Sequence, residues 1–287
     1  MQTMMDKQTK QTTGVDRLTI FDSVCDAMDT VHGTKNATCN DNQHWITDWR
    51  YESKWMDNKT QSEIVKLTDT PQTSTIQQIN KLRESIESNE PTFSQPALRR
   101  KRRRGLDNGD EIDIDRAITG DMFCWEQMQR TLTPHKTISI MCNVSVSCDK
   151  QRHHLLPRGA ALCALAEWLS TRNYNCEILC GVHTSNIYAR GKNATWAIVT
   201  RLKKPEMPLD VQSIATALCE IGFVRGVFVK HYCTHGDRRL NHSIGIPGSM
   251  HEQTIKYFDC DVVCPDNILN ERDAQIWLEQ TIKQLSK

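Results

Sequence analysis

Two short apolar runs joined by a long apolar helix limit what this chain can fold into more than any other feature. The runs TISIMC (137–142) and EILCGV (177–182) are bounded by polar residues, as buried strands are. Between them, residues 155–169 are apolar around much of a helix circumference. A strand, helix and strand in this order form a right-handed crossover with parallel strands. The sequence therefore predicts an α/β fold with an open, mostly parallel sheet and helices on both faces.

The rest of that domain follows from the same patterns. After the crossover we expect an antiparallel edge strand, a helix, two further strands and a closing helix, at residues 194–200, 209–221, 226–232, 260–264 and 274–285. In an open α/β sheet the ligand end is the carboxyl edge of the strands. Here that edge carries Asn143, Ser145 and Ser147.

The first part of the chain has a different character. Residues 1–15 are rich in Thr and Gln and predict a disordered lead, and 16–90 predict a small, mostly helical region with helical spacing at 20–31, 64–67 and 76–86. Residues 91–115 predict a linker, basic and then acidic. The α/β domain is expected over 116–287, opening with a helix at Arg116 that Asp115 caps.

Composition narrows the classes of function and location. The 287 residues carry 36 Lys and Arg against 35 Asp and Glu, so no global field steers the chain to nucleic acid or membrane. No run approaches the roughly 20 apolar residues of a membrane span, and because the first residues lack the apolar core of a signal peptide we expect no secretory route. We expect a cytoplasmic protein with no membrane partner, whose 12 cysteines are reduced.

One local charge run is an alternative binding feature. Six consecutive cations can neutralise phosphates and predict a nucleic-acid contact or a localisation signal. Acidic residues follow at once over 107–115 and can pair with the cations, cancelling much of their field. Both interpretations stay open for Arg99, Arg100, Lys101, Arg102, Arg103 and Arg104.

The element order and the Asn143-Val-Ser145-Val-Ser147 motif resemble the von Willebrand factor A fold over about residues 137–286. That family has Asp-x-Ser-x-Ser here, and the resemblance implies a site for Mg²⁺ or Mn²⁺ that accepts a partner's carboxylate. A later aspartate of the family's site would correspond to Asp237. Because Asn143 replaces the acidic residue, the resemblance implies a degenerate metal-ion-dependent adhesion site. The alternative is a polar loop that caps itself through Asx and hydroxyl turns.

A longer stretch carries a second resemblance. The run RRKRRRGLDNGDEIDIDRAITGDMFCWEQM (99–128) and the domain after it resemble a family of uncharacterised proteins of tailed phages and their prophages. That resemblance implies a phage origin and the cytoplasm of the host cell, and it implies no activity.

A zinc site is the remaining candidate. His231, Cys233 and His235 would share one face if the strand expected at 226–232 continued through them. Two imidazoles and a thiolate suit Zn²⁺ and leave an open position for hydrolysis. In the alternative, both histidines are solvated at a strand end and the cysteine packs inward.

No nucleophile elbow, phosphate loop or dinucleotide signature occurs. The sequence therefore favours a non-catalytic protein-interaction or assembly module that binds a protein partner through the carboxyl-edge loops. We expect no cofactor beyond Mg²⁺ or Mn²⁺ at the degenerate site. A nucleic-acid-associated protein and a zinc-dependent hydrolase are the alternatives, and the sequence sets no oligomeric state.

Overall fold

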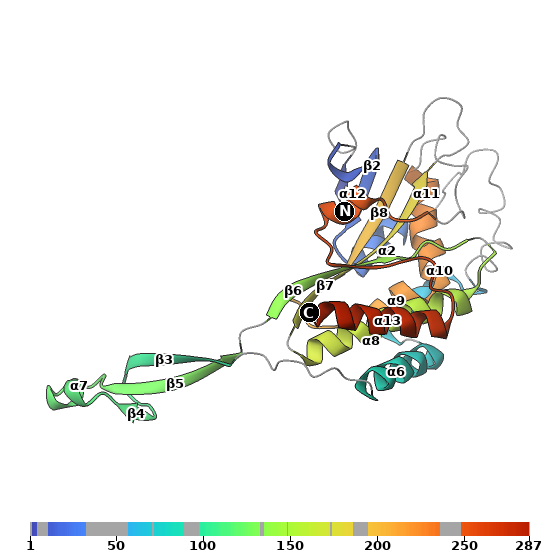
Figure 1. The fold of residues 1–287 in the computed structure, drawn as a ribbon. Coiled ribbons are helices and arrows are strands. Elements are labelled where there is room, and N and C mark those ends of the chain that lie inside the picture. Colours follow the sequence, from blue (N-terminus) through green and yellow to red (C-terminus); the bar gives the residue numbers. More distant parts are fainter. Residues whose placement is uncertain are drawn as a thin grey trace.

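A computed structural model describes residues 2–4, 11–32, 57–70, 72–88, 98–132, 135–147, 149–172, 174–185, 195–235 and 248–286. Two sheets organise them: a six-stranded sheet in the main body and a three-stranded sheet in an arm that projects from it (Figure 1). The strands are β1 (Gln2–Met4), β2 (Arg17–Phe21), β3 (Leu98–Leu106), β4 (Glu111–Ile112), β5 (Trp125–Leu132), β6 (His135–Asn143), β7 (Tyr174–Ser185), β8 (Thr195–Lys203) and β9 (Val262–Cys264). The helices are α2 (Val24–His32), α5 (Gln61–Asp69), α6 (Thr73–Ser88), α7 (Ile114–Ile118), α8 (Arg152–Thr171), α9 (Val211–Cys219), α10 (Ile221–Phe223), the π-helix η1 (Val224–Val229), α11 (Lys230–His235), α12 (Glu252–Tyr257) and α13 (Glu271–Leu285).

The main sheet has the strand order β1-β2-β8-β7-β6-β9. The pairings β2/β8, β6/β7 and β6/β9 are parallel, while β1/β2 and β7/β8 are antiparallel. The crossover from β6 through α8 to β7 is the one that the sequence predicts. The fold is therefore an α/β fold with an open, mostly parallel sheet.

Helices cover the two faces of this sheet unequally. One face carries side chains such as Ile140, Ile178 and Ile198, and packs in one large core with α6, α8, α9 and α13. The other face carries a smaller core that includes Met141, Leu179 and Phe258, where α12 and its flanks cover the sheet. Alternation along each strand explains the division, because successive side chains point to opposite faces.

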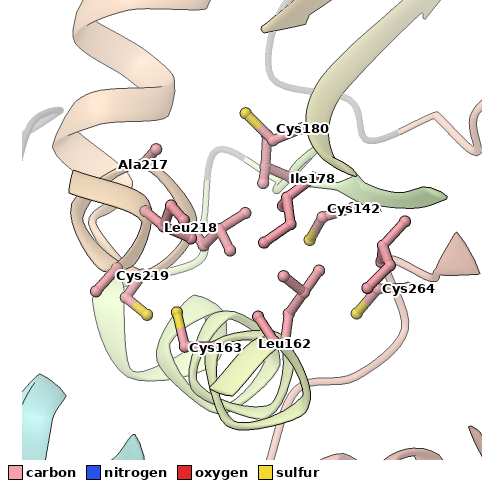
Figure 2. Close-up of a cluster of buried hydrophobic side chains, with 14 of the residues drawn as sticks. Cys142, Leu162, Cys163, Ile178, Cys180, Ala217, Leu218, Cys219 and Cys264 are labelled. Atoms are coloured by element: carbon pink, nitrogen blue, oxygen red, sulfur yellow. The ribbon is translucent and has the colours of Figure 1, made fainter. Parts of the chain in front are cut away.

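A row of buried cysteines lies where α8 and α9 meet the sheet (Figure 2). Cys142 of β6 is in register with Cys180 of β7 and with Cys264 of β9, so three thiols stand side by side on one face. Cys163 of α8 and Cys219 of α9 lie across from them (Figure 2). All five are free thiols with almost no exposed surface, and they fill the core as small apolar groups.

The helices α8 and α9 touch at a glycine. A Cβ atom on Gly159 would lie 2.6 Å from both the Cys219 Sγ and the Leu218 carbonyl oxygen. Real Cβ atoms do not approach other atoms so closely, so the absence of a side chain at this position sets the spacing of the two helices.

A buried carboxylate joins four segments behind the sheet. Glu220, between α9 and α10, is 1% exposed and accepts a hydrogen bond from Arg152 Nε at 2.9 Å. Lys59 Nζ lies 3.6 Å from its other oxygen, and the Thr75 hydroxyl of α6 lies 3.5 Å from the first. The Arg152 guanidinium also donates to Thr75. This cluster links the start of α8 to α6 and to the residues before α5.

Four of the sequence predictions about the main body are wrong. Residues 2–4, within the predicted disordered lead of residues 1–15, form strand β1. Residues 226–232 are helical, in η1 and α11, and do not form a strand. Strand β8 is antiparallel to β7 as predicted, but it is not at the edge, because β2 and β1 lie beyond it. Residues 17–21, which the sequence places in a helical region, form that strand β2, while α2, α5 and α6 confirm helices near the other predicted positions.

The arm consists of residues that the sequence divides between a linker and the α/β domain. The basic run lies in β3, which pairs antiparallel with β5, and β5 also pairs with β4. Gly105, with φ of +74°, stands at a bulge in β3, where only glycine adopts a left-handed conformation without cost. The helix α7 begins two residues earlier than predicted, since the carboxylate of Asp113, and not that of Asp115, caps it by accepting from Arg116 N–H.

No single helix in the described ranges is long and apolar enough to cross a membrane. Helix α9 and the helical run Ile221–Tyr232 pass that test only as a pair, and they are bent by 73° where they meet.

Candidate functional site

The loop after β6 holds the motif that the sequence singles out. Asn143 is 2% exposed, and its side chain bonds to protein at both ends. Its Oδ1 accepts from the Ser145 N–H at 3.0 Å, and its Nδ2 donates to the Gly248 carbonyl at 2.9 Å. The first of these bonds is an Asx turn, the alternative that the sequence left open. Asn143 therefore ties the loop to the segment before α12.

Two buried arginines hold the same loop from behind. Arg158 of α8 donates from Nη2 to the Ser145 carbonyl at 3.3 Å. Arg225 of η1 donates from Nη2 to the Ser147 carbonyl at 3.1 Å and to the Lys150 carbonyl at 2.7 Å. Arg158 and Arg225 are 1% and 6% exposed, so two guanidinium charges lie beneath this loop.

The side chains and charges at this loop do not suit the binding of a divalent cation. The Asn143 oxygen already accepts a backbone hydrogen bond, and the two guanidinium groups would repel a positive ion. Within the described ranges, no cluster of His, Cys, Asp or Glu has the geometry of a metal site. Asp237 lies outside the described residues. The Mg²⁺ or Mn²⁺ site therefore stays a prediction that the charges around the loop disfavour.

The loop also does not present its first two polar side chains as a docking surface. Asn143 and Ser145 are both buried, at 2% and 6% exposure, while Ser147 is half-buried. The predicted protein-binding surface at this edge was centred on Asn143, Ser145, Ser147 and Asp237, and it is wrong for the buried Asn143 and Ser145.

The zinc hypothesis for His231, Cys233 and His235 rested on a strand that does not form. In the helix α11, residues two positions apart point about 200° away from each other, so the backbone does not bring 231 and 233 to one face. The His231 ring is buried and packs edge-on against Phe21 at 5.2 Å and Trp196 at 5.6 Å between centroids. The side chains of Cys233 and His235 lie outside the described part of the structure.

A second histidine lies at the same end of the sheet. His183 of β7 lies beside Gly248: a Cβ atom added to Gly248 would lie 3.2 Å from His183 Nδ1. The ring centroid of His183 is 6.5 Å from that of His251. Burial, and then the charge of His251, lower the pKa of His183 to about 4. The His183 ring is therefore neutral at pH 7.

The basic run forms part of β3, one of the two edge strands of the arm sheet. Arg104, at its end, pairs with Glu126 of β5 at 3.1 Å. The side chains of Arg99 to Arg103 lie outside the described part of the structure, so nucleic-acid contact through them stays a prediction.

The tip of the arm has the most unusual surface among the described residues. Five large apolar side chains between positions 112 and 123 are exposed, at fractions from 46% to 79%: Ile112, Ile114, Ile118, Met122 and Phe123. No residue of α7 is buried. Six acidic residues of the same segment are exposed or half-buried, against the single cation Arg116 within 107–123: Asp107, Asp110, Glu111, Asp113, Asp115 and Asp121.

Sequence reasoning missed this surface, which we call the arm tip (residues 107–123). The segment IDIDRAITGDMF alternates apolar and charged residues, a pattern that equally fits a strand or helix with one buried face. Only the projection of the arm away from the main body leaves the apolar side chains exposed (Figure 1).

Together these features define an α/β protein with an open mixed sheet, a buried polar loop at the carboxyl end of β6 and a projecting β-arm. Residues 8–280 match the model of a family described as a domain of unknown function (DUF7192), and the chain belongs to that family. No curated protein and no solved structure matches the chain significantly. The resemblances to von Willebrand factor A domains and to phage proteins stay predictions.

Proposed function

We propose that this protein is a non-catalytic interaction module that docks on another protein through the arm tip. The observation that carries the proposal is the set of five exposed apolar side chains within 12 residues (112–123). Exposed apolar groups that gather in one place, with polar residues around them, are typical of protein-binding sites. This proposal keeps the class of function that the sequence favours and moves the contact surface from the sheet edge to the arm.

The shape of the arm supports docking into a groove. The β3/β5 pair carries α7 at its far end, away from the main core (Figure 1). Ile114 and Ile118 are four positions apart in α7 and lie on one side of it. Burying an Ile or Phe side chain contributes about 1.5–3 kcal/mol before the cost of association. A few such anchors are enough for a specific contact.

The charges around the tip define the chemistry of the partner. Six carboxylates and one arginine lie within 107–121, so the rim of the surface is strongly acidic. A partner with an apolar groove and a basic rim complements it, whereas a second arm tip would bring like charges together. The proposal therefore commits to a different protein with a basic-rimmed groove and not to a second copy of this chain.

The test uses the full chain with a photo-crosslinking residue in place of Ile118, in extract of the cells that produce it. A matched probe replaces Ser170, which is exposed on α8 of the main body. We expect a crosslinked protein at Ile118 that is absent at Ser170. After purification, that protein should bind the wild type with salt-sensitive affinity. It should bind a variant with the four substitutions I114S, I118S, M122S and F123S, called the fourfold variant, at least about tenfold more weakly.

Three results would overturn the proposal. Equal affinity of the purified partner for the wild type and the fourfold variant would remove the arm tip from the contact. Self-association that the fourfold variant abolishes would replace the partner by a second copy. Salt-dependent binding of duplex or single-stranded DNA that survives the four substitutions and is lost on neutralising Arg99 to Arg104 would favour the nucleic-acid alternative.

A further inference from the structure

The strongest unexplained feature outside the arm is an incompletely bonded arginine in the main core. Arg158 is 1% exposed, and its Nη2 has one acceptor, the Ser145 carbonyl at 3.3 Å. Its Nε and Nη1 are buried and have no hydrogen-bond partner within the described residues. None of the described carboxylates forms an ion pair with it. Burying a charge costs much free energy unless an opposite charge and hydrogen bonds compensate for it.

A second unpartnered group lies beside it. The Ser145 hydroxyl is buried and has no partner among the described residues, although the same residue's carbonyl accepts from Arg158. The guanidinium and the hydroxyl are adjacent, and both side chains are more than nine-tenths buried. Their N–H and O–H groups are hydrogen-bond donors that have no acceptor among the described residues. Buried polar groups in native proteins almost always have partners, so this pair requires an explanation.

The position in the sheet points to a ligand. Strand β7, which follows β6 in the chain, lies on one side of β6, and β9 lies on the other, so the strand order reverses at β6. The chain leaves β6 through α8 on one face and reaches β9 from α12 on the other. In open α/β sheets, ligands bind outside the carboxyl ends of the strands at such a reversal. Ser145 follows the end of β6 by two residues.

The positive charges beneath the loop favour a ligand with a negative charge. Arg158 and Arg225 place two positive charges beneath residues 144–150, and Arg225 holds the loop through the carbonyls of Ser147 and Lys150. Arg225 comes from η1, a π-helix, and π-helical turns are frequent at functional sites. Arginine presents N–H groups in a planar fork that matches carboxylate and phosphate oxygens.

We propose that Arg158 and Ser145 form a binding site for a small oxyanion, a carboxylate or phosphate group, at the carboxyl end of β6. The anion accepts from the Arg158 guanidinium and from the Ser145 hydroxyl, and it neutralises the buried charge. The site goes beyond docking at the arm tip and lies at the place where the sequence predicts a cation. Because the buried arginines are positively charged, the ligand proposed here is an anion and not the predicted cation.

The test is titration of the full chain with sodium phosphate and, separately, with sodium formate, each against sodium chloride at equal ionic strength. Binding is followed by calorimetry and by the melting temperature. We expect phosphate or formate, and not chloride, to bind at millimolar concentration and to raise the melting temperature. S145A should weaken binding about tenfold, R158M should abolish it, and R272M, on the exposed side of α13, should leave it unchanged.

R158M supplies a second readout that a merely structural arginine would not give. Because the substitution removes an uncompensated buried charge and leaves similar volume, R158M in chloride should melt at or above the wild-type temperature. If R158M does not fold, R158K decides, since lysine keeps the charge and loses the fork and should weaken binding about tenfold or more.

Two outcomes would overturn the site. One is the absence of any phosphate or formate effect beyond that of chloride on the wild type. The other is an adventitious ion only, recognised by binding that S145A and the Arg158 variants leave unchanged. A response to phosphate alone or to formate alone would support the site and identify which oxyanion it takes.

Discussion

Substituting Glu220 by Gln should destabilise the protein more than any conservative change at a surface ion pair. The carboxylate is 1% exposed, and the side chains of its partners Arg152 and Lys59 are only 14% and 16% exposed. Removing one charge of a buried pair typically costs about 3–5 kcal/mol, because the other charge stays buried. The Gln oxygen can still accept from Arg152, so we expect a loss near the lower value, about 3 kcal/mol.

The assay is urea unfolding at pH 7, followed by tryptophan fluorescence and by far-UV circular dichroism, whose transitions must coincide. The shift of the midpoint multiplied by the mean slope gives the change in the free energy of unfolding. The matched control is E271Q, which breaks the pair between Glu271 and Lys81, whose side chains are 52% and 66% exposed. That pair should contribute at most about 1 kcal/mol. If E220Q costs no more than E271Q, the cluster around Glu220 does not stabilise the fold as argued.

Three further predictions follow from the described contacts. G159A should lower the free energy of unfolding by about 1–3 kcal/mol, despite the better helix propensity of alanine, because the new methyl group collides with α9; S170A on the same helix serves as the control in urea. His183 has a pKa of about 4, below its unfolded value near 6.5, so protonation favours the unfolded chain: this stability is fully present above pH 6.5 and is lost progressively as the pH falls from 6.5 through 4. Between pH 7 and pH 5 the wild type should therefore lose about 2 kcal/mol more than H183Q, and parallel pH dependences would contradict this. The fourfold arm-tip variant should keep the wild-type urea midpoint within about 0.5 kcal/mol, since the side chains it removes are exposed; a larger loss would mean that the tip packs on the protein itself.

Long periodic segments of the fold could be predicted from the sequence. The apolar spacing of α6, α8, α9 and α13 and the short runs of β6, β7 and β9 gave the correct element type and order. The segment 226–232 failed for a physical reason. The first four residues of the run GVFVKHY, which lie in η1, are all apolar or glycine, and so short a run without periodicity does not distinguish a buried helix from a strand.

The arm and the buried arginines were beyond prediction for a different reason. A strand of consecutive cations has no apolar alternation, and only its pairing with β5 makes β3 a strand. Arg158 occurs within an apolar helical run, where its charge gives no local sign of how many hydrogen bonds the folded protein supplies. Only the three-dimensional positions of Ser145 and the loop reveal that two of its nitrogens lack acceptors.

Strand β2 has a consequence for synthesis of the chain on the ribosome. It lies between β1 and β8, and Asp16, just before it, bonds to Thr195, 179 residues later. At about 5–20 residues per second, β8 emerges roughly 10–35 seconds after β2. During that interval the apolar residues Leu18, Ile20 and Phe21 have no strand to pair with on the β8 side. Strand β2 is therefore synthesised early, but it is among the last strands to complete its pairing in the sheet. A nascent chain arrested before residue 195 should therefore expose this strand to chaperones, and one arrested well after residue 203 should not.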